Sequence, residues 1–164
     1  MSSMQYTTKT FLKKMKYRRK HWDSLINTII KKRLDKEKIS EKWYFKDVIC
    51  HITWYDIEVL KALETKSIVE SKFWNASISE RNEMIFNDTQ EITLDKILKE
   101  SKRVFKDLIN KIEDLSDEDL NSDEYIKRKS DKRITWDFVG ANDFWHFEDH
   151  EDVLIERFDL DYGM

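Results

Sequence analysis

The sequence predicts an all-α protein, and more narrowly a four-helix bundle in an up-down-down-up arrangement. Two observations indicate this fold class: the 164 residues include two glycines and no proline, and apolar residues recur at steps of three and four in four long segments. Sheets need turn residues at many corners, whereas long helices need few. A chain of this length fits a single domain, 1–164, with its core from about 8 to 158.

The first two helices are expected at about 8–33 and 43–63. The polar stretch 34–42 between them is short enough to make these helices antiparallel neighbours. Their apolar stripes, which we expect to face the core, are Phe11, Met15, Trp22, Leu25, Ile26, Ile29 and Ile30 in the first helix, and Phe45, Val48, Ile49, Ile52, Val59, Leu60 and Leu63 in the second.

The last two helices are expected at about 94–112 and 136–158. Thr93 and Thr135 stand directly before them as candidate N-caps, because a hydroxyl oxygen there can accept a hydrogen bond from a free backbone N–H group. Both helices carry apolar stripes of their own, so each is expected to bury one face.

The connection 64–93 is long enough to carry the chain back along a helix of about 30 Å. The second and third helices would then run parallel, which gives the up-down-down-up order. Within this connection, residues 79–87 are expected to form a short helix capped by Ser79. After the third helix, residues 116–120 are expected to form a helical turn.

Composition and charge exclude several classes of protein. The net charge is -3, and no apolar run reaches the roughly 20 residues that a membrane-spanning helix needs. Cys50 is the only cysteine, which fits a reducing compartment, so we expect a cytoplasmic protein without membrane contact. Residues 1–22 carry seven Lys or Arg and no acid, and we interpret this run as a solvated helix face rather than a nucleic-acid interface.

The histidines carry the candidate chemistry. His146 and His150 are four residues apart, so they share one face of a helix, and that face continues the predicted apolar stripe. His51 lies in the middle of the second helix, and a bundle can bring it against the other two. Three neutral imidazoles suit a divalent ion such as Zn, Ni, Fe or Mn. The alternative is three partly buried histidines that hydrogen-bond to nearby acids or to Tyr55, and His21 is expected on the surface.

Two other residues bear on the site. Trp74 lies in the long connection, where a lid over a pocket would form, so we expect it outside the core. Cys50 is next to His51 but turned by about 100° on the helix, and we interpret it as a small buried side chain.

Three stretches resemble the DinB-like superfamily, which includes DinB-like and YfiT-like metalloproteins. The pattern W-x-x-K-D-V-I-x-H-I-x-W-Y from Trp43 is similar to the signature of the second helix in that superfamily. Residues 80–82 together with 94–120 are similar to its middle part, and 142–150 are similar to its closing helix. The resemblance implies an up-down-down-up four-helix bundle. It also implies that His51, His146 and His150 match the metal triad of the family. Tyr44, Phe45 and the glycine-free, proline-free stretch 123–135 depart from the common pattern.

The resemblance also implies a class of activity. Relatives include thiol-dependent S-transferases, a maleylpyruvate isomerase that uses a low-molecular-weight thiol, and proteins that disarm genotoxins. We therefore expect a metal-dependent hydrolase or thiol S-transferase that acts on a reactive small molecule, with Asp47 and Tyr55 as candidate catalytic residues. Glu58 and Asp143 are further candidates for orienting ligands.

Two alternatives stay open. The first is a non-catalytic stress, resistance or ligand-binding protein whose metal, if it has one, is structural. The second, which is weaker, is association with nucleic acid through the basic first helix. A homodimer is also open, because helix faces often mediate association.

Overall fold

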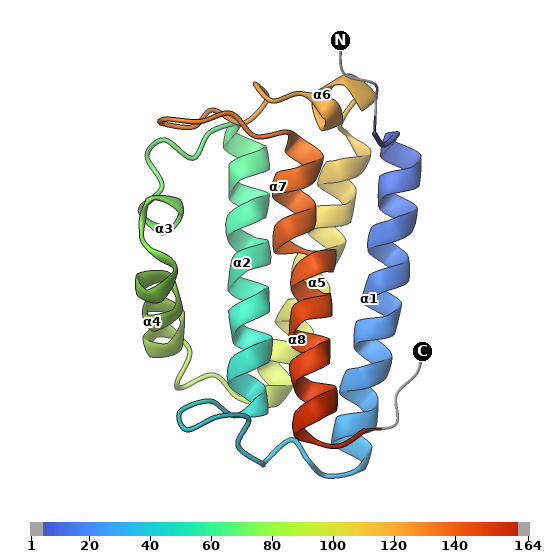
Figure 1. The fold of residues 1–164 in the computed structure, drawn as a ribbon, viewed down its shortest axis with the longest axis vertical. Helices are drawn as coiled ribbons and strands as arrows, with labels where there is room; N and C mark the ends of the chain where they lie inside the picture. The colour runs from blue at the N-terminus through green and yellow to red at the C-terminus, as the bar shows by residue number, and fades with distance from the viewer. Residues whose placement is uncertain (1–4, 161–164) are drawn as a thin grey trace.

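The computed structural model describes residues 5–160, and this part of the chain is helical with no β-strand. The predicted all-α class is therefore confirmed, and the helices form a bundle (Figure 1). In chain order the helices are α1 (Thr8–Lys31), α2 (Phe45–Thr65), α3 (Lys72–Asn75), α4 (Ile78–Asp88), α5 (Leu94–Glu113), α6 (Asp117–Asn121), α7 (Thr135–Asn142) and α8 (Phe144–Arg157).

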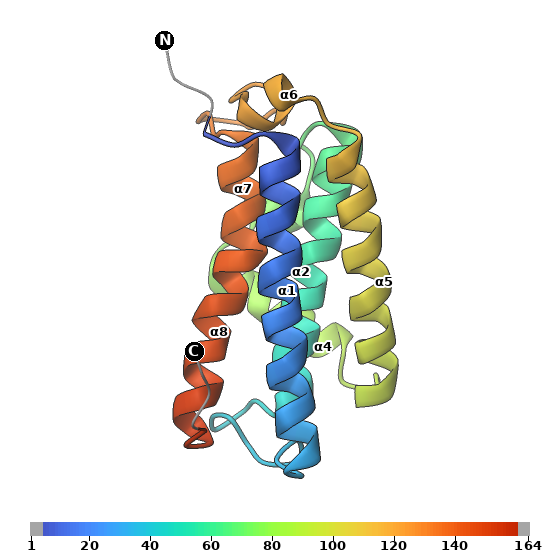
Figure 2. The same ribbon diagram turned by 90° about the vertical axis from the view of Figure 1, so that its right-hand side faces the viewer.

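Four columns of helix stand side by side, formed by α1, α2, α5 and the end-to-end pair α7 and α8 (Figures 1 and 2). α2 packs against α5, and α1 packs against both α8 and α5. α3 and α4 lie outside α2 and form a crossover, which carries the chain from the end of α2 to the opposite end of the bundle, where α5 begins (Figure 1).

Large apolar side chains from all four columns fill the interior. Phe11 and Met15 of α1 and Leu63 of α2 are completely buried, as their apolar stripes predict. Trp22 of α1 stacks on Phe147 of α8, with ring centroids 5.3 Å apart. Each such side chain contributes about 1.5–3 kcal/mol on burial, so this core holds the helices in place around their polar groups. Within residues 5–160, no helix is both long and apolar enough to cross a membrane.

Hydroxyl side chains start several of the helices. Thr93 accepts a hydrogen bond from the backbone N–H of Lys96, which confirms it as the N-cap of α5. The predicted turn at 116–120 is also present as α6, which Ser116 caps. Such a cap typically contributes about 1 kcal/mol.

The predicted cap of the short helix in the crossover is wrong. Ser77 caps α4, because its hydroxyl oxygen accepts from the backbone N–H of Glu80 at 3.1 Å and donates to the Glu80 carboxylate at 2.9 Å. Ser79 lies inside the first turn instead. The Ser77 cap starts the helix at Ile78, which places Ser79 inside the helix.

The single helix predicted at 136–158 is also wrong, because it is interrupted at Asp143. The backbone of Asp143 has φ -121° and ψ -98°, so it ends α7 and begins α8. Gly140 lies just before the break, where a Cβ atom would lie 2.7 Å from Cζ of Phe144. The aromatic ring therefore packs closely against the backbone of α7, an arrangement that the spacing of apolar residues does not reveal.

Thr135 does not cap the last column. It is the first residue of α7, and Ile134 occupies the N-cap position without a side-chain hydrogen bond. The Thr135 hydroxyl instead donates to the backbone carbonyl of Ser122 at 3.1 Å. This bond ties the start of α7 to the end of α6, so tertiary contact replaces the predicted local cap.

Candidate metal centre

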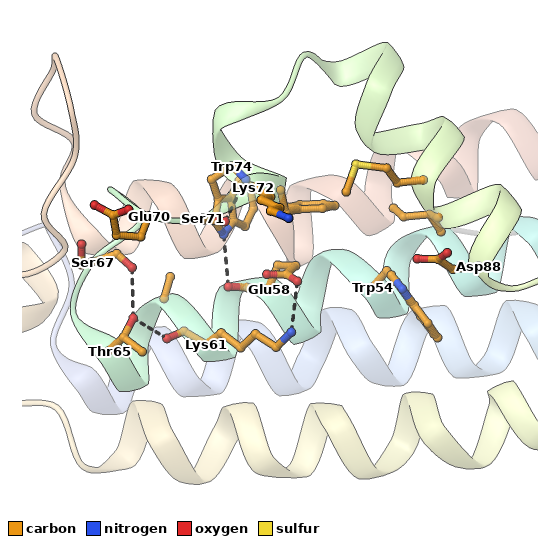
Figure 3. A pocket seen from close by; sticks show the side chains of 14 residues that line it. Trp54, Glu58, Lys61, Thr65, Ser67, Glu70, Ser71, Lys72, Trp74 and Asp88 are labelled. Carbon is orange, nitrogen blue, oxygen red and sulfur yellow. Dashed lines mark hydrogen bonds and ion pairs between the residues drawn. The ribbon is translucent and has the colours of Figure 1, made fainter.

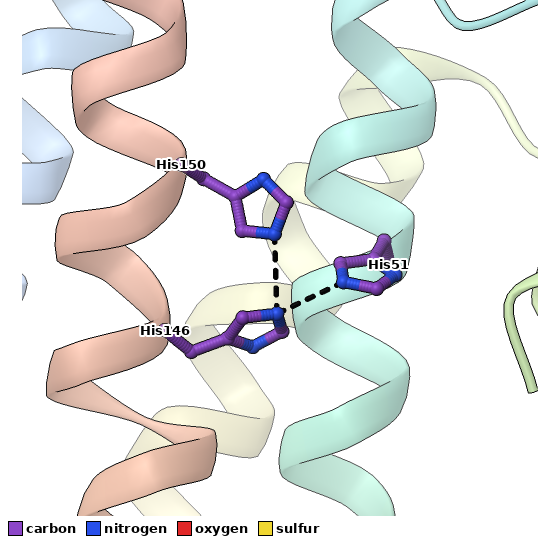
Figure 4. Close-up of side chains that lie close together, drawn as sticks. All are labelled: His51, His146 and His150. Atoms are coloured by element: carbon purple, nitrogen blue, oxygen red, sulfur yellow. Dashed lines mark hydrogen bonds between the residues drawn. The ribbon is translucent and has the colours of Figure 1, made fainter. Parts of the chain in front are cut away.

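Three histidines from two helices meet inside the bundle. Figure 4 shows His51 on α2 and His146 and His150 on α8, with all three rings directed into the space between the helices. His51 is 6% exposed, and the other two are half-buried. The structure therefore brings together the three residues that the sequence singles out as metal ligands.

Two of the spacings between ring nitrogens match those of ligands bound to one ion. Nε2 of His146 lies 2.9 Å from Nε2 of His51 and 3.1 Å from Nε2 of His150. The ligand atoms of all three residues lie within 4.8 Å of one another. Nitrogens that bind one ion at about 2.0–2.1 Å are about 2.9–3.4 Å apart when the angle between them is about 90–109°. Both spacings at His146 fall in this range, so the cluster could hold a metal ion.

The surroundings keep these imidazoles uncharged. Burial, followed by the charges of the other two rings, lowers the pKa of His51 far below its ordinary value. Burial and the neighbouring His150 lower the pKa of His146 to about 3, and burial lowers the pKa of His150. The three rings are therefore neutral at physiological pH, which is the form of histidine that binds metals.

Neutral rings cannot satisfy one another in this arrangement. Each nitrogen of a neutral imidazole has either one hydrogen or one lone pair. Nε2 of His146 contacts two other Nε2 atoms, but its single hydrogen or lone pair serves only one of those contacts well. A cation between the rings would accept all three lone pairs, so the residues present fit a metal ion better than a hydrogen-bonded histidine cluster.

Aromatic side chains cover the cluster. The ring centroid of Trp43 lies 5.3 Å from that of His51. The Tyr55 ring lies 4.9 Å from His51 and 5.0 Å from His146, and it also contacts Trp74. These contacts account for the burial of His51, which is the main cause of its lowered pKa.

Asp47 lies in the first turn of α2, one turn before His51. Its Oδ2 atom accepts a hydrogen bond from the backbone N–H of Tyr44 at 2.8 Å, so the carboxylate caps the helix. Within the described part of the chain, Oδ1 of Asp47 and Nδ1 of His51 are both buried without a hydrogen-bond partner. The structure therefore shows a helix-capping role for Asp47, and the second oxygen of its carboxylate, Oδ1, can still accept a hydrogen bond.

The other two candidate acids lie away from the rings. Oε1 of Glu58 pairs with Lys61 at 3.2 Å. Asp143 is completely buried, which raises its pKa, and it lies close enough to Asp56 and Arg19 for charge interactions among the three to shift the pKa of both acids. The sequence interpretation missed Asp56 and Arg19. The signal that could have identified them is that both charged residues fall on the apolar stripes of their helices.

His21 and Cys50 take no part in the cluster. His21 is only partly exposed, and its Nδ1 atom lies 3.1 Å from Oε2 of Glu151. Cys50 is completely buried, as predicted, and burial raises the pKa of its thiol to about 11.

A groove of about 650 Å³ lies beside the cluster, between α2 and the crossover (Figure 3). Its lining includes Trp54, Glu58, Trp74 and Met84 but none of the three clustered histidines. The Trp74 indole N–H donates to the backbone carbonyl of Glu58 at 3.2 Å, and its ring contacts Tyr55. Trp74 is half-buried, and through Tyr55, which contacts both Trp74 and two of the histidine rings, the groove adjoins the cluster.

Comparison with known proteins supports the fold and names no function. No family profile matches the chain, and no curated protein does. An uncharacterised protein from Escherichia coli UTI89 has a similar crystal structure, with a TM-score of 0.73 and 14% sequence identity over 95% of this chain and 96% of that one.

Proposed function

We propose that this protein is a DinB-like metalloprotein in which His51, His146 and His150 bind one divalent transition-metal ion. The observation that supports this most directly is the convergence of three neutral imidazoles from two helices, with Nε2 spacings of 2.9 and 3.1 Å at His146. Imidazole ligands suit Zn, Ni, Fe or Mn-type ions. The up-down-down-up arrangement belongs to the same proposal, and the crossover between the ends of α2 and α5 supports it.

The activity that we propose is hydrolysis, or transfer to a low-molecular-weight thiol, of a reactive small molecule. A divalent ion supplies Lewis acidity, which lowers the pKa of a water or a thiol enough to make it a nucleophile at neutral pH. A set of three protein ligands, rather than four, is typical of catalytic sites.

The side chains around the rings have distinct roles in this proposal. Ring contacts hold Tyr55 against His51 and His146. In this proposal the Tyr55 hydroxyl donates a hydrogen bond to an oxygen of the substrate. Asp47 would orient His51, since a hydrogen bond from Nδ1 of His51 to Oδ1 of Asp47 would satisfy two buried atoms that lack partners within residues 5–160. Trp43 shields the His51 ring from water.

A second candidate function is non-catalytic binding of a small ligand. The observation that favours it is the position of the 650 Å³ groove, which lies beside the histidines rather than over them. In that case a ligand would occupy the groove against Trp54 and Trp74, and the metal would only stabilise the fold. The two functions differ in whether removal of the metal abolishes turnover.

The first test is the metal content of the untagged protein. Elemental analysis is expected to find about one transition-metal ion per chain in the wild type, and far less in His146→Ala and His150→Ala. His21→Ala is the matched control, because His21 is a histidine of the same bundle outside the cluster. Equal metal content in all four proteins would contradict the metal site.

The second test is turnover by the metal-loaded and the chelated protein. Two probes separate the proposed reactions: 4-nitrophenyl acetate for hydrolysis, and 1-chloro-2,4-dinitrobenzene with glutathione for thiol transfer. Metal-dependent turnover of either probe that is lost in His146→Ala would support the enzyme. A metal-loaded protein that binds ligands in the groove but turns over neither probe would support the second candidate.

A further inference from the structure

A buried carboxylate ties the histidine-bearing helix α8 to α1. Glu151 of α8 is 3% exposed. Its Oε2 atom accepts a hydrogen bond from Nη2 of Arg18 at 2.8 Å and lies 3.1 Å from Nδ1 of His21. Within residues 5–160, Oε1 of Glu151 is buried without a hydrogen-bond partner. Arg18 and His21 therefore supply the polar contacts that make the burial of this acid tolerable.

Arg18 also reaches a second acid of α8. Its Nε atom lies 3.3 Å from Oε1 of Glu148. Glu148 and Glu151 are three residues apart on the helix, so they are neighbours on one face. One arginine of α1 thus contacts two acids on the same face of α8, and a contact of this kind is directional, because it requires that face to point toward α1.

This acidic face points away from the metal ligands. At about 100° per helical residue, the side chain of Glu151 leaves α8 about 100° from that of His150 and about 140° from that of His146. Glu148 lies about 160° from both histidines. α8 packs against α1 and α2, so the acids are held on the α1 side while the histidines meet His51 on the α2 side.

Few other features of the column fix its rotation. The regular helical backbone is interrupted at Asp143, so the rotation of α8 does not follow from that of α7. The stacked rings of Trp22 and Phe147 hold α1 and α8 together, but apolar contacts are non-directional and permit some sliding or turning. The Arg18–Glu151 bond supplies the direction that these contacts lack.

We propose that Arg18 and Glu151 are positioning residues of the metal centre, whose hydrogen-bonded ion pair fixes the rotation of α8 so that His146 and His150 face His51. The inference rests on the proposed metal site. A turn of α8 by one residue, about 100°, would carry Glu151 away from Arg18 and both of its histidines away from His51.

The first test is Co²⁺ binding, followed by the visible absorbance of the bound ion. We expect Arg18→Ala and Glu151→Ala each to weaken binding about tenfold, the low end of what is typical when a residue that orients metal ligands is lost. Glu151→Gln should stay within about threefold of the wild type, because its amide oxygen can still accept the hydrogen bond from Arg18.

A double variant separates the pair from its members. Arg18→Ala combined with Glu151→Ala should lose no more affinity than either single variant, because all three lack the same bond. His21→Ala is the matched control at Glu151, since it leaves the bond from Arg18 in place. Arg103→Ala, which removes an exposed arginine paired with acids of α5, is the matched control for the loss of an arginine. Both controls should stay within about threefold of the wild type.

A second readout does not depend on metal. The imidazole ¹⁵N and ¹H shifts of His146 and His150, measured in chelator-treated protein, should move in the two alanine variants and return in Glu151→Gln. Far-UV circular dichroism and urea unfolding check that each variant folds. If a single alanine variant does not fold, the double variant, which leaves neither charge unpaired, tests the same bond.

Three results would overturn the inference. The first is a folded alanine variant with wild-type Co²⁺ affinity and unchanged imidazole shifts. The second is a Glu151→Gln protein that loses as much affinity as Glu151→Ala, and the third is a double variant whose loss is the product of the two single losses. If the wild type binds no Co²⁺, the proposed function fails, and the imidazole shifts of the metal-free variants still decide the positioning role.

Discussion

Metal binding at the histidine cluster should raise the thermal stability of the protein, and the loss of one ring should abolish most of that gain. His146 is the most informative position, because its Nε2 atom lies within 2.9 Å of His51 and 3.1 Å of His150. Its replacement by alanine leaves two possible ligands on different helices. A two-histidine site of that kind binds a divalent ion much more weakly than three converging nitrogens do.

The size of the effect follows from ligand linkage. At a metal concentration 100-fold above Kd, the wild type gains about 2.7 kcal/mol of unfolding free energy. For a chain of this size each kcal/mol is about 2–4 °C, so the expected rise in Tm is roughly 5–11 °C. If His146→Ala weakens binding 100-fold, the same metal concentration stabilises it by only about 0.4 kcal/mol, or about 1–2 °C.

Differential scanning calorimetry of chelated and Zn²⁺-loaded protein measures both values. His21→Ala should keep the full metal-dependent rise, because His21 lies outside the cluster and contacts Glu151. In the absence of metal, His146→Ala should lower the free energy of unfolding by about 1 kcal/mol or less. The neutral His146 ring can satisfy at most one of its two contacts with the other histidine rings. A wild-type Tm that does not respond to metal, or a His146→Ala protein that responds fully, would refute the reasoning.

Three further predictions concern the rest of the bundle. Cys50, buried with its pKa raised to about 11, should react with Ellman's reagent only as fast as the protein unfolds, and rapid labelling of the native protein would contradict its burial. Gly140→Ala gains about 1 kcal/mol of helix propensity but places Cβ 2.7 Å from Phe144, which costs about 1–3 kcal/mol. Urea unfolding should therefore show a net loss of about 1 kcal/mol, and equal or higher stability would count against the close packing. Burial raises the pKa of Asp56 and Asp143, so the native state binds more protons than the unfolded state above pH ~3.9. The wild type should accordingly lose stability relative to Asp143→Asn as the pH rises from 5 to 8, and parallel pH profiles would refute this.

Much of the fold follows from local rules that act within a few residues. The two glycines and the absence of proline favour long helices, and the three- and four-residue spacing of Trp22, Leu25 and Ile29 identifies a face that is indeed buried. Thr93 caps its helix as predicted, because capping depends only on the next three residues. Thr135 does not, since its hydroxyl bonds to Ser122, thirteen residues earlier in the chain.

The sequence by itself determined that the chain is helical and that His146 and His150 share a helix face, because covalent spacing and the helical period are enough for both. The tertiary structure alone decided that His51 meets them, that Asp143 breaks the last column, and that Asp56 and Arg19 are buried in the core. These arrangements depend on the rotation of one helix against another. That rotation arises from packing and hydrogen bonds between residues far apart in the chain, which no local pattern encodes.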